Sequence, residues 1–135
     1  MAVGKGRTAA RWLLLAVLDH LREEGWRIQP QALEDATTLA ETDDARRLIV
    51  LYAHRKAIEL QQTVLHETFH VVFPHADEAR VRALEQSVFP LLGRPERCLL
   101  QALATGKTIR EAVEAYEEEQ PAPAGHRAAR SGRAK

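Results

Sequence analysis

Residues 64–78, VLHETFHVVFPHADE, contain the end of one predicted helix and the beginning of the next. Apolar residues recur at helical spacing up to this point, so we expect a helix over residues 56–72. Pro74 disfavours helical geometry in the residue before it and therefore ends that helix. Asp77 is a typical N-cap residue and predicts a second helix over residues 77–92. Because the link between the two helices is short, we expect them to pack antiparallel.

Within this stretch, the motif HETFH places His66, Glu67 and His70 on the first of these helices. Residues four apart lie on the same face of a helix, so the two imidazoles can bind one Zn²⁺ ion. Zinc lowers the pKa of a bound water, and the intervening glutamate can accept the proton that is released. Apolar positions fill most of the helix circumference, whereas the motif shares a polar strip with Glu59 and Gln62. The pattern favours a zinc site, with Glu67 as general base, over two histidines in a core.

A catalytic zinc ion usually has three protein ligands and one position for water. The downstream candidates for the third ligand are His75, Asp77, Glu78 and Glu85. Glu85 falls among the apolar positions of the second helix, where a carboxylate is costly unless it is paired or bound to metal. Glu78 points in a similar direction, but an acidic residue in a first turn also complements the helix dipole. We therefore expect Glu85 to be the third ligand and keep Glu78 as the alternative.

Three short segments before the motif predict a small sheet. WRIQP (26–30) alternates and ends in proline, while TTLAET (37–42) and ARRLIVLY (45–52) are rich in β-branched and apolar residues. Asp43 and Asp44 predict a hairpin turn between the last two segments. Because LIVLY is apolar at consecutive positions, we expect both faces of that strand to be covered. With the surrounding helices, these segments predict an α+β fold that contains a small antiparallel sheet.

Three further helices are predicted outside the motif region. Residues 8–24 carry apolar side chains at helical spacing, and so do residues 95–105. Thr108 and Glu111 have the spacing of a capping box, which predicts a last helix that runs to about residue 119.

The composition suits one domain, which we expect over residues 1–120, followed by a basic tail without regular structure over residues 121–135. The 135 residues carry a formal net charge of zero, unlike a nucleic-acid-binding protein with a strong overall field. The single cysteine, Cys98, excludes an internal disulfide, and its helical spacing to two leucines predicts that it is buried. The apolar run 12–18 is too short to span a bilayer, so we expect a cytoplasmic protein that does not enter the membrane.

The order of these features resembles the small zincins of the gluzincin type, near the ImmA/IrrE-like and phage or prophage metallopeptidase domains. RRLIVLY, TVLHETFHVVFP and DEARVRALEQSVFPLL carry the resemblance, which covers about residues 26–92. It implies a zinc-dependent peptidase with His66 and His70 as ligands, Glu67 as general base and a glutamate of the following helix as third ligand. It also implies that an extended peptide or protein substrate binds beside the edge strand of the sheet.

Two other functions are weaker alternatives. A zincin fold that binds zinc for regulation, with little turnover, would carry the same motif, and a Glu67→Gln variant separates it from an enzyme. LATGKTIREAVEAY (103–116) has spacing similar to a helix-turn-helix, and the C-terminal tail is basic. The second helix of that pair nevertheless ends in three glutamates, which are poorly suited to phosphate contact. Nucleic-acid binding is therefore the least favoured function.

A peptidase also needs a hydrogen-bond donor for the oxyanion that develops during hydrolysis. The candidate donors are Tyr52, His54, His75 and Tyr116. Nothing in the sequence places any one of them over the metal, so no residue is assigned to this role.

Overall fold

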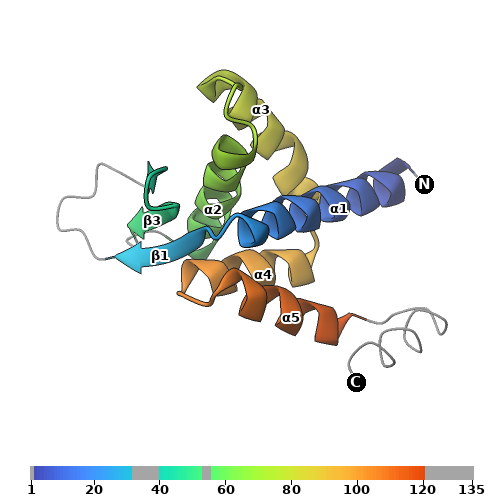
Figure 1. The fold of residues 1–135 in the computed structure, drawn as a ribbon. Helices are drawn as coiled ribbons and strands as arrows, with labels where there is room; N and C mark the ends of the chain where they lie inside the picture. Colours follow the sequence, from blue (N-terminus) through green and yellow to red (C-terminus); the bar gives the residue numbers. More distant parts are fainter. Residues whose placement is uncertain (1, 32–39, 53–55, 121–135) are drawn as a thin grey trace.

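The computed structural model describes residues 2–31, 40–52 and 56–120. Over these residues the chain forms five helices, one 3₁₀ turn and a three-stranded sheet, which confirms the α+β class (Figure 1). The elements in chain order are α1 (Ala2–Glu23), β1 (Arg27–Gln31), β2 (Ala40–Asp43), β3 (Leu48–Tyr52), α2 (Ala57–Val72), α3 (Glu78–Val88), η1 (Phe89–Leu91), α4 (Arg94–Ala104) and α5 (Ile109–Glu119). The predicted tail, residues 121–135, lies outside the described residues.

The sheet is mixed, so the predicted antiparallel sheet is wrong for one of its strands. Its order is β1-β3-β2, in which β3 runs antiparallel to β2 and parallel to β1. A tight turn after Asp43 joins β2 to β3, and strands joined in this way must run antiparallel. The apolar strand β3 is buried on both faces, as expected, and takes the central position with both of its edges paired. β1 therefore pairs with β3 and not with β2, which is the next strand in the sequence.

Two helices end in glycines with left-handed backbone geometry. Gly25 has φ 81°, and the amide of Trp26 donates to the carbonyl of Leu21 at 2.9 Å. Gly106 has φ 106°, and the amide of Lys107 donates to the carbonyl of Ala102 at 3.1 Å. Both are Schellman motifs, in which glycine avoids the steric cost of a positive φ. They end α1 and α4 close to the positions that the sequence predicts.

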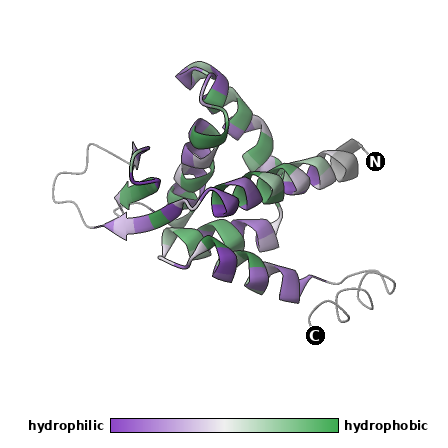
Figure 2. Cartoon of the chain, in the orientation of Figure 1, coloured by the Kyte–Doolittle hydropathy of each residue, from purple (hydrophilic) through white to green (hydrophobic). Residues whose placement is uncertain are grey.

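The motif helix α2 lies in the middle of the fold, because it packs against α1, α3 and α4 and also contacts β2 and β3. Figure 2 shows hydrophobic residues along α2 and on the part of α4 nearest the sheet, with hydrophilic residues along the outer side of α5. The fully buried side chains with the largest volumes come from α1, α2, α4 and β3: Phe69, Leu14, Leu18, Leu21, Ile49, Leu51, Leu65, Leu100 and Leu103.

A buried carboxylate joins α4 to α5. Glu96, of which 7% is exposed, accepts the Tyr116 hydroxyl proton through Oε2 at 2.6 Å and the Gly93 amide proton through Oε1 at 2.8 Å. Burial, and then the hydrogen bond to Glu96, raise the pKa of the Tyr116 phenol. Because both carboxylate oxygens have a donor, the charge is tolerated inside the fold.

The structure bears on the predicted burial of Cys98 and on the possibility of a membrane-spanning helix. Cys98 is exposed on α4, so the prediction that it is buried is wrong. Leu99 and Leu100 occupy the inward positions of that helix, and the cysteine beside them faces outward. In the described part of the chain, no helix has the length and apolar character needed to cross a membrane.

Candidate metal centre

The core packing of α2 leaves the motif at the surface of the protein. Four α2 residues, Val64, Leu65, Thr68 and Phe69, are buried in the interior. The opposite strip, which includes Glu59, Gln62, His66 and Glu67, borders a hollow instead. The His66 side chain is 14% exposed and that of His70 is 30% exposed, so both rings are partly shielded from water. The predicted polar strip is found, but the apolar face is buried over less of the helix than expected, because Ile58 is 48% exposed.

The rings of His66 and His70 converge with Glu78 from the first turn of α3. Their Nε2 atoms lie 3.1 Å apart, and the Nε2 of His70 lies 2.7 Å from Glu78 Oε1. The Nε2 of His66 lies 3.3 Å from that same oxygen. These three residues form a group that could hold a metal ion, and its ligand atoms all lie within 4.8 Å of one another.

The distances between His66 Nε2, His70 Nε2 and Glu78 Oε1 are compatible with a bound zinc ion. Zinc binds imidazole nitrogen at 2.0–2.1 Å and carboxylate oxygen at 2.0–2.2 Å in a tetrahedron, so neighbouring ligand atoms lie about 3.3 Å apart. The three edges between His66, His70 and Glu78 measure 3.1, 2.7 and 3.3 Å. An ion could be accommodated with side-chain shifts of a few tenths of an ångström. Two nitrogens and one carboxylate oxygen are also ligands that zinc prefers.

The surroundings of Glu78 favour its ionised form. Burial raises the pKa of this carboxyl, but hydrogen bonds with His70, His66 and Arg82 outweigh that effect, so its pKa lies below the ordinary value. Arg82, one turn further along α3, contacts Glu78 Oε2 at 2.9 Å. A carboxylate must be ionised to bind a divalent cation. The arginine therefore supports the ionised form of Glu78, whose Oε1 lies near both histidines and whose Oε2 also lies 3.1 Å from His66 Nε2.

Glu85, the expected third ligand, lies on a different side of His66. Its Oε1 is 3.1 Å from Nδ1 of that ring, whereas His70 and Glu78 approach Nε2. As expected from its position on α3, Glu85 points inward, and its side chain is 16% exposed. The structure therefore brings His66, His70 and Glu78 together and places Glu85 behind the first histidine. This geometry favours Glu78, the alternative, as the third ligand.

Glu67 lies between two hollows on the surface of α2. One hollow, of about 400 Å³, is bordered by His66, Glu67 and Glu85 among others. The second hollow, of about 340 Å³, is bordered by Thr42, Glu67 and His70 among others. Glu67 is the residue that the two linings share, and its Oε1 accepts the hydroxyl proton of Thr42 at 3.1 Å.

The other sequence candidates lie outside the metal group. Asp77 caps α3 by accepting the Arg80 amide proton at 2.8 Å, the structural role that its position suggested. Tyr116 is engaged with Glu96 in the interior, which removes it as an oxyanion donor. His75 is exposed in the link between α2 and α3. His54 lies outside the described residues, and Tyr52 is buried at the end of β3.

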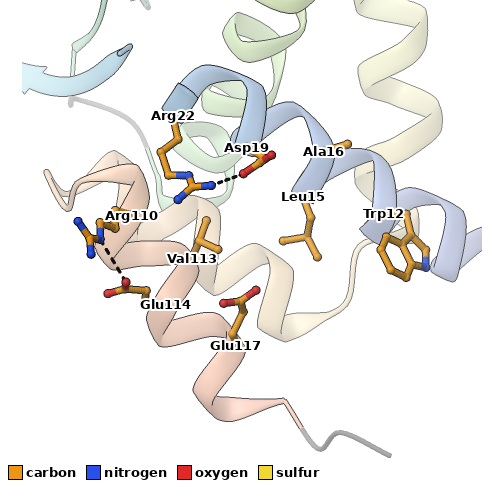
Figure 3. A pocket seen from close by; sticks show the side chains of 9 residues that line it. All are labelled: Trp12, Leu15, Ala16, Asp19, Arg22, Arg110, Val113, Glu114 and Glu117. Atoms are coloured by element: carbon orange, nitrogen blue, oxygen red, sulfur yellow. Dashed lines mark hydrogen bonds and ion pairs between the residues drawn. The ribbon is translucent and has the colours of Figure 1, made fainter. Parts of the chain in front are cut away.

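A further hollow of about 420 Å³ lies between α1 and α5, and none of its lining residues belongs to the metal group (Figure 3). Figure 3 shows an ion pair on each helix, Asp19 with Arg22 and Arg110 with Glu114, at its border. Trp12, which is 65% exposed, lies at one end. The residues that line this hollow include neither a histidine nor a cysteine, and their charges are largely paired. The candidate site is therefore the motif on α2.

Comparison with protein families, curated proteins and solved structures finds no match to this chain. The candidate site therefore depends on its own geometry and on the motif that supplies it.

Proposed function

We propose that this chain is a zinc-dependent peptidase whose metal is held by His66 Nε2, His70 Nε2 and a carboxylate oxygen of Glu78. The observation that supports this proposal is the convergence of these three atoms, with separations of 2.7 to 3.3 Å, at an HExxH motif. The resemblance to small zincins agrees with it, because such families take their third ligand from a glutamate of the following helix.

Each residue has a distinct part in the proposed reaction. Zinc bound here supplies a Lewis acid, which polarises a peptide carbonyl and makes water a competent nucleophile near neutral pH. Glu67, between the two hollows, accepts the proton of the attacking water and then transfers it to the departing amine. His66, His70 and Glu78 keep their positions during these steps, because α2 and α3 pack directly against each other.

The substrate in this proposal is an extended peptide beside β2. In the described part of the sheet β2 is an edge strand, which pairs with β3 on one side only. An edge strand has backbone donors and acceptors that an added peptide strand can use. β2 also contacts α2, and Ala40 and Thr42 each border one of the two hollows beside Glu67. A peptide bound there lies within reach of the general base.

Metal analysis of purified protein tests the metal part of this proposal. We expect about one zinc per chain in the parent and in Glu67→Gln, and little or none in His66→Ala. Zinc retained in full by His66→Ala would contradict the site. Hydrolysis of a fluorogenic peptide library tests the reaction, since removal of a general base typically lowers the rate about 10²- to 10⁴-fold. Zinc binding without hydrolysis in the parent would favour the regulatory alternative, and unchanged hydrolysis in Glu67→Gln would refute the role of the base.

A further inference from the structure

We infer that Glu85 is a positioning residue for His66: its carboxylate accepts the Nδ1 proton of that ring and so keeps Nε2 available to the metal. This inference rests on the zinc site proposed above. It differs from the role expected from the sequence, in which Glu85 would itself contact the ion.

The two nitrogens of His66 have different partners. Nδ1 lies 3.1 Å from Glu85 Oε1, whereas Nε2 lies 3.1 Å from the Nε2 of His70 and 3.1 Å from Glu78 Oε2. The two nitrogens point to different sides of an imidazole ring, so an oxygen at Nδ1 is not a neighbour of an ion at Nε2. An ionised carboxylate only accepts hydrogen bonds, and the proton in this contact must therefore belong to Nδ1. When an ion is bound, a proton on Nδ1 leaves the Nε2 lone pair for that ion, which then replaces the direct contact between Nε2 and Glu78.

Burial gives the pair a second physical reason to persist. The side chains of His66 and Glu85 are 14% and 16% exposed, so water provides little compensation to either polar group. A carboxylate shielded to this extent is costly without a hydrogen-bond donor. Val81 and Val88, one turn before and about one turn after Glu85 on α3, are both buried in the core. The helix therefore has little freedom to turn Glu85 away from the ring.

One stripe of α3 carries both the proposed ligand and the groups that support the site. Glu78, Arg82 and Glu85 stand at i, i+4 and i+7, which places them on one face of the helix. Arg82 contacts Oε2 of Glu78, and Glu85 contacts the ring of His66 on α2. The packing of α3 on α2 thus sets the third ligand and the orientation of the first histidine together.

Loss of the Glu85 carboxylate should weaken metal binding without removing a ligand. Carboxylates that accept the second N–H of a metal-binding histidine fix its tautomer and ring orientation, and their loss typically lowers metal affinity about 10- to 100-fold. Replacement of Glu85 by glutamine keeps an oxygen that accepts the same proton, so Glu85→Gln should lose less affinity than Glu85→Leu. Removal of the proposed ligand in Glu78→Gln should change the ligand set itself.

Zinc titration against a chromophoric chelator is the first test. We expect the zinc Kd to rise about 10- to 100-fold in Glu85→Leu and by a smaller factor in Glu85→Gln. Glu114→Gln is the matched control, because it removes a carboxylate that is paired with Arg110 on α5, away from the site. Its Kd should stay within about twofold of the parent. A Glu85→Leu variant that binds zinc as tightly as the parent would overturn the inference.

The absorption spectrum of the Co²⁺-substituted protein separates a ligand from a positioning residue. At saturating Co²⁺, the Glu85→Leu protein should keep the parent's d–d bands, because its ligands are unchanged, while Glu78→Gln should shift them. A spectrum in which Glu85→Leu shifts the bands and Glu78→Gln does not would assign Glu85 as the ligand and overturn the inference.

Nitrogen NMR of the metal-free protein tests the contact without zinc. We expect Nδ1 of His66 to be protonated in the parent, and we expect this signature to be lost in Glu85→Leu and retained in Glu85→Gln. A parent that binds no zinc would refute the proposed peptidase, and the spectra would still decide whether Glu85 holds this ring. The same His66 tautomer in the parent and in Glu85→Leu would overturn the inference on its own.

Discussion

The hydroxyl of Thr42 on β2 donates a hydrogen bond to Glu67 Oε1 on α2 at 3.1 Å. The bond connects the strand beside which a peptide is proposed to bind with the residue proposed to act as base. The two residues stand 25 positions apart in the sequence, so only the folded sheet brings them together.

Replacement of Thr42 by valine should slow hydrolysis without changing the metal site. Valine has a similar shape but no donor, and the freed Glu67 side chain can sample unproductive orientations. Because the bond is exposed, we expect kcat to fall only about 3- to 10-fold, with little change in KM. Steady-state kinetics and zinc content measure both effects. Thr42→Ser keeps the hydroxyl and should retain most of the activity, whereas equal rates in all three proteins would contradict the coupling.

Added zinc should raise the thermal midpoint of unfolding of the parent protein. A ligand that binds only the folded state stabilises it by about 2.7 kcal/mol at a free concentration 100 times its Kd. Differential scanning fluorimetry with and without zinc gives the shift, and a chelator should reverse it. His70→Ala lacks one proposed ligand and should respond far less. The same shift in His70→Ala would place the stabilising zinc elsewhere on the protein.

Replacement of Tyr116 by phenylalanine should destabilise the protein by about 1–3 kcal/mol, because it leaves a buried oxygen of Glu96 without its donor. Urea unfolding measures the change in the free energy of unfolding. Tyr52→Phe is the matched control, since the carboxylate that Tyr52 meets, Glu41, is exposed to water and keeps solvent as a partner. An equal loss in the two variants would show that the buried carboxylate has no special dependence on its phenol.

The Tyr116 phenol should also add a pH dependence to stability in alkaline solution. Burial, and then the hydrogen bond to Glu96, raise its pKa in the folded state. Its contribution is fully present below the unfolded value of about 10 and is lost as the pH rises from there towards the folded value, because the unfolded chain releases the proton first. Unfolding free energies at pH 8, 9.5 and 10.5 should therefore fall less steeply in Tyr116→Phe than in the parent. Parallel curves would contradict this.

Local sequence signals predict most helix boundaries of this protein, although α1 begins at Ala2 and not at residue 8, and α3 ends at Val88 and not at residue 92. Pro74 and Asp77 mark the boundary between α2 and α3, and the capping box of Thr108 and Glu111 marks the start of α5. Each of these signals acts within one helical turn, so it is readable without the tertiary structure. The direction of β1 was not readable in this way, because it depends on which edge of β3 remained free.

The contacts of the candidate site could likewise be predicted only in part from the sequence. Helical periodicity predicts that Glu85 faces inward and that such a carboxylate needs a partner. It does not determine which side of His66 the carboxylate reaches, because that depends on the packing of α3 against α2. Arg82 could have been noticed from its spacing of four residues after Glu78. Thr42 gave no such signal, since its contact with Glu67 depends on the placement of β2 across the helix.

The edge of the sheet formed by β2 is short and acidic. β2 has four residues, AETD, and two of them are Glu41 and Asp43. If two copies of the chain met edge to edge at this strand, their carboxylates would be brought together and would repel each other. The same charges would attract a strand that carries lysine or arginine. Self-association through two β2 edges is thus disfavoured.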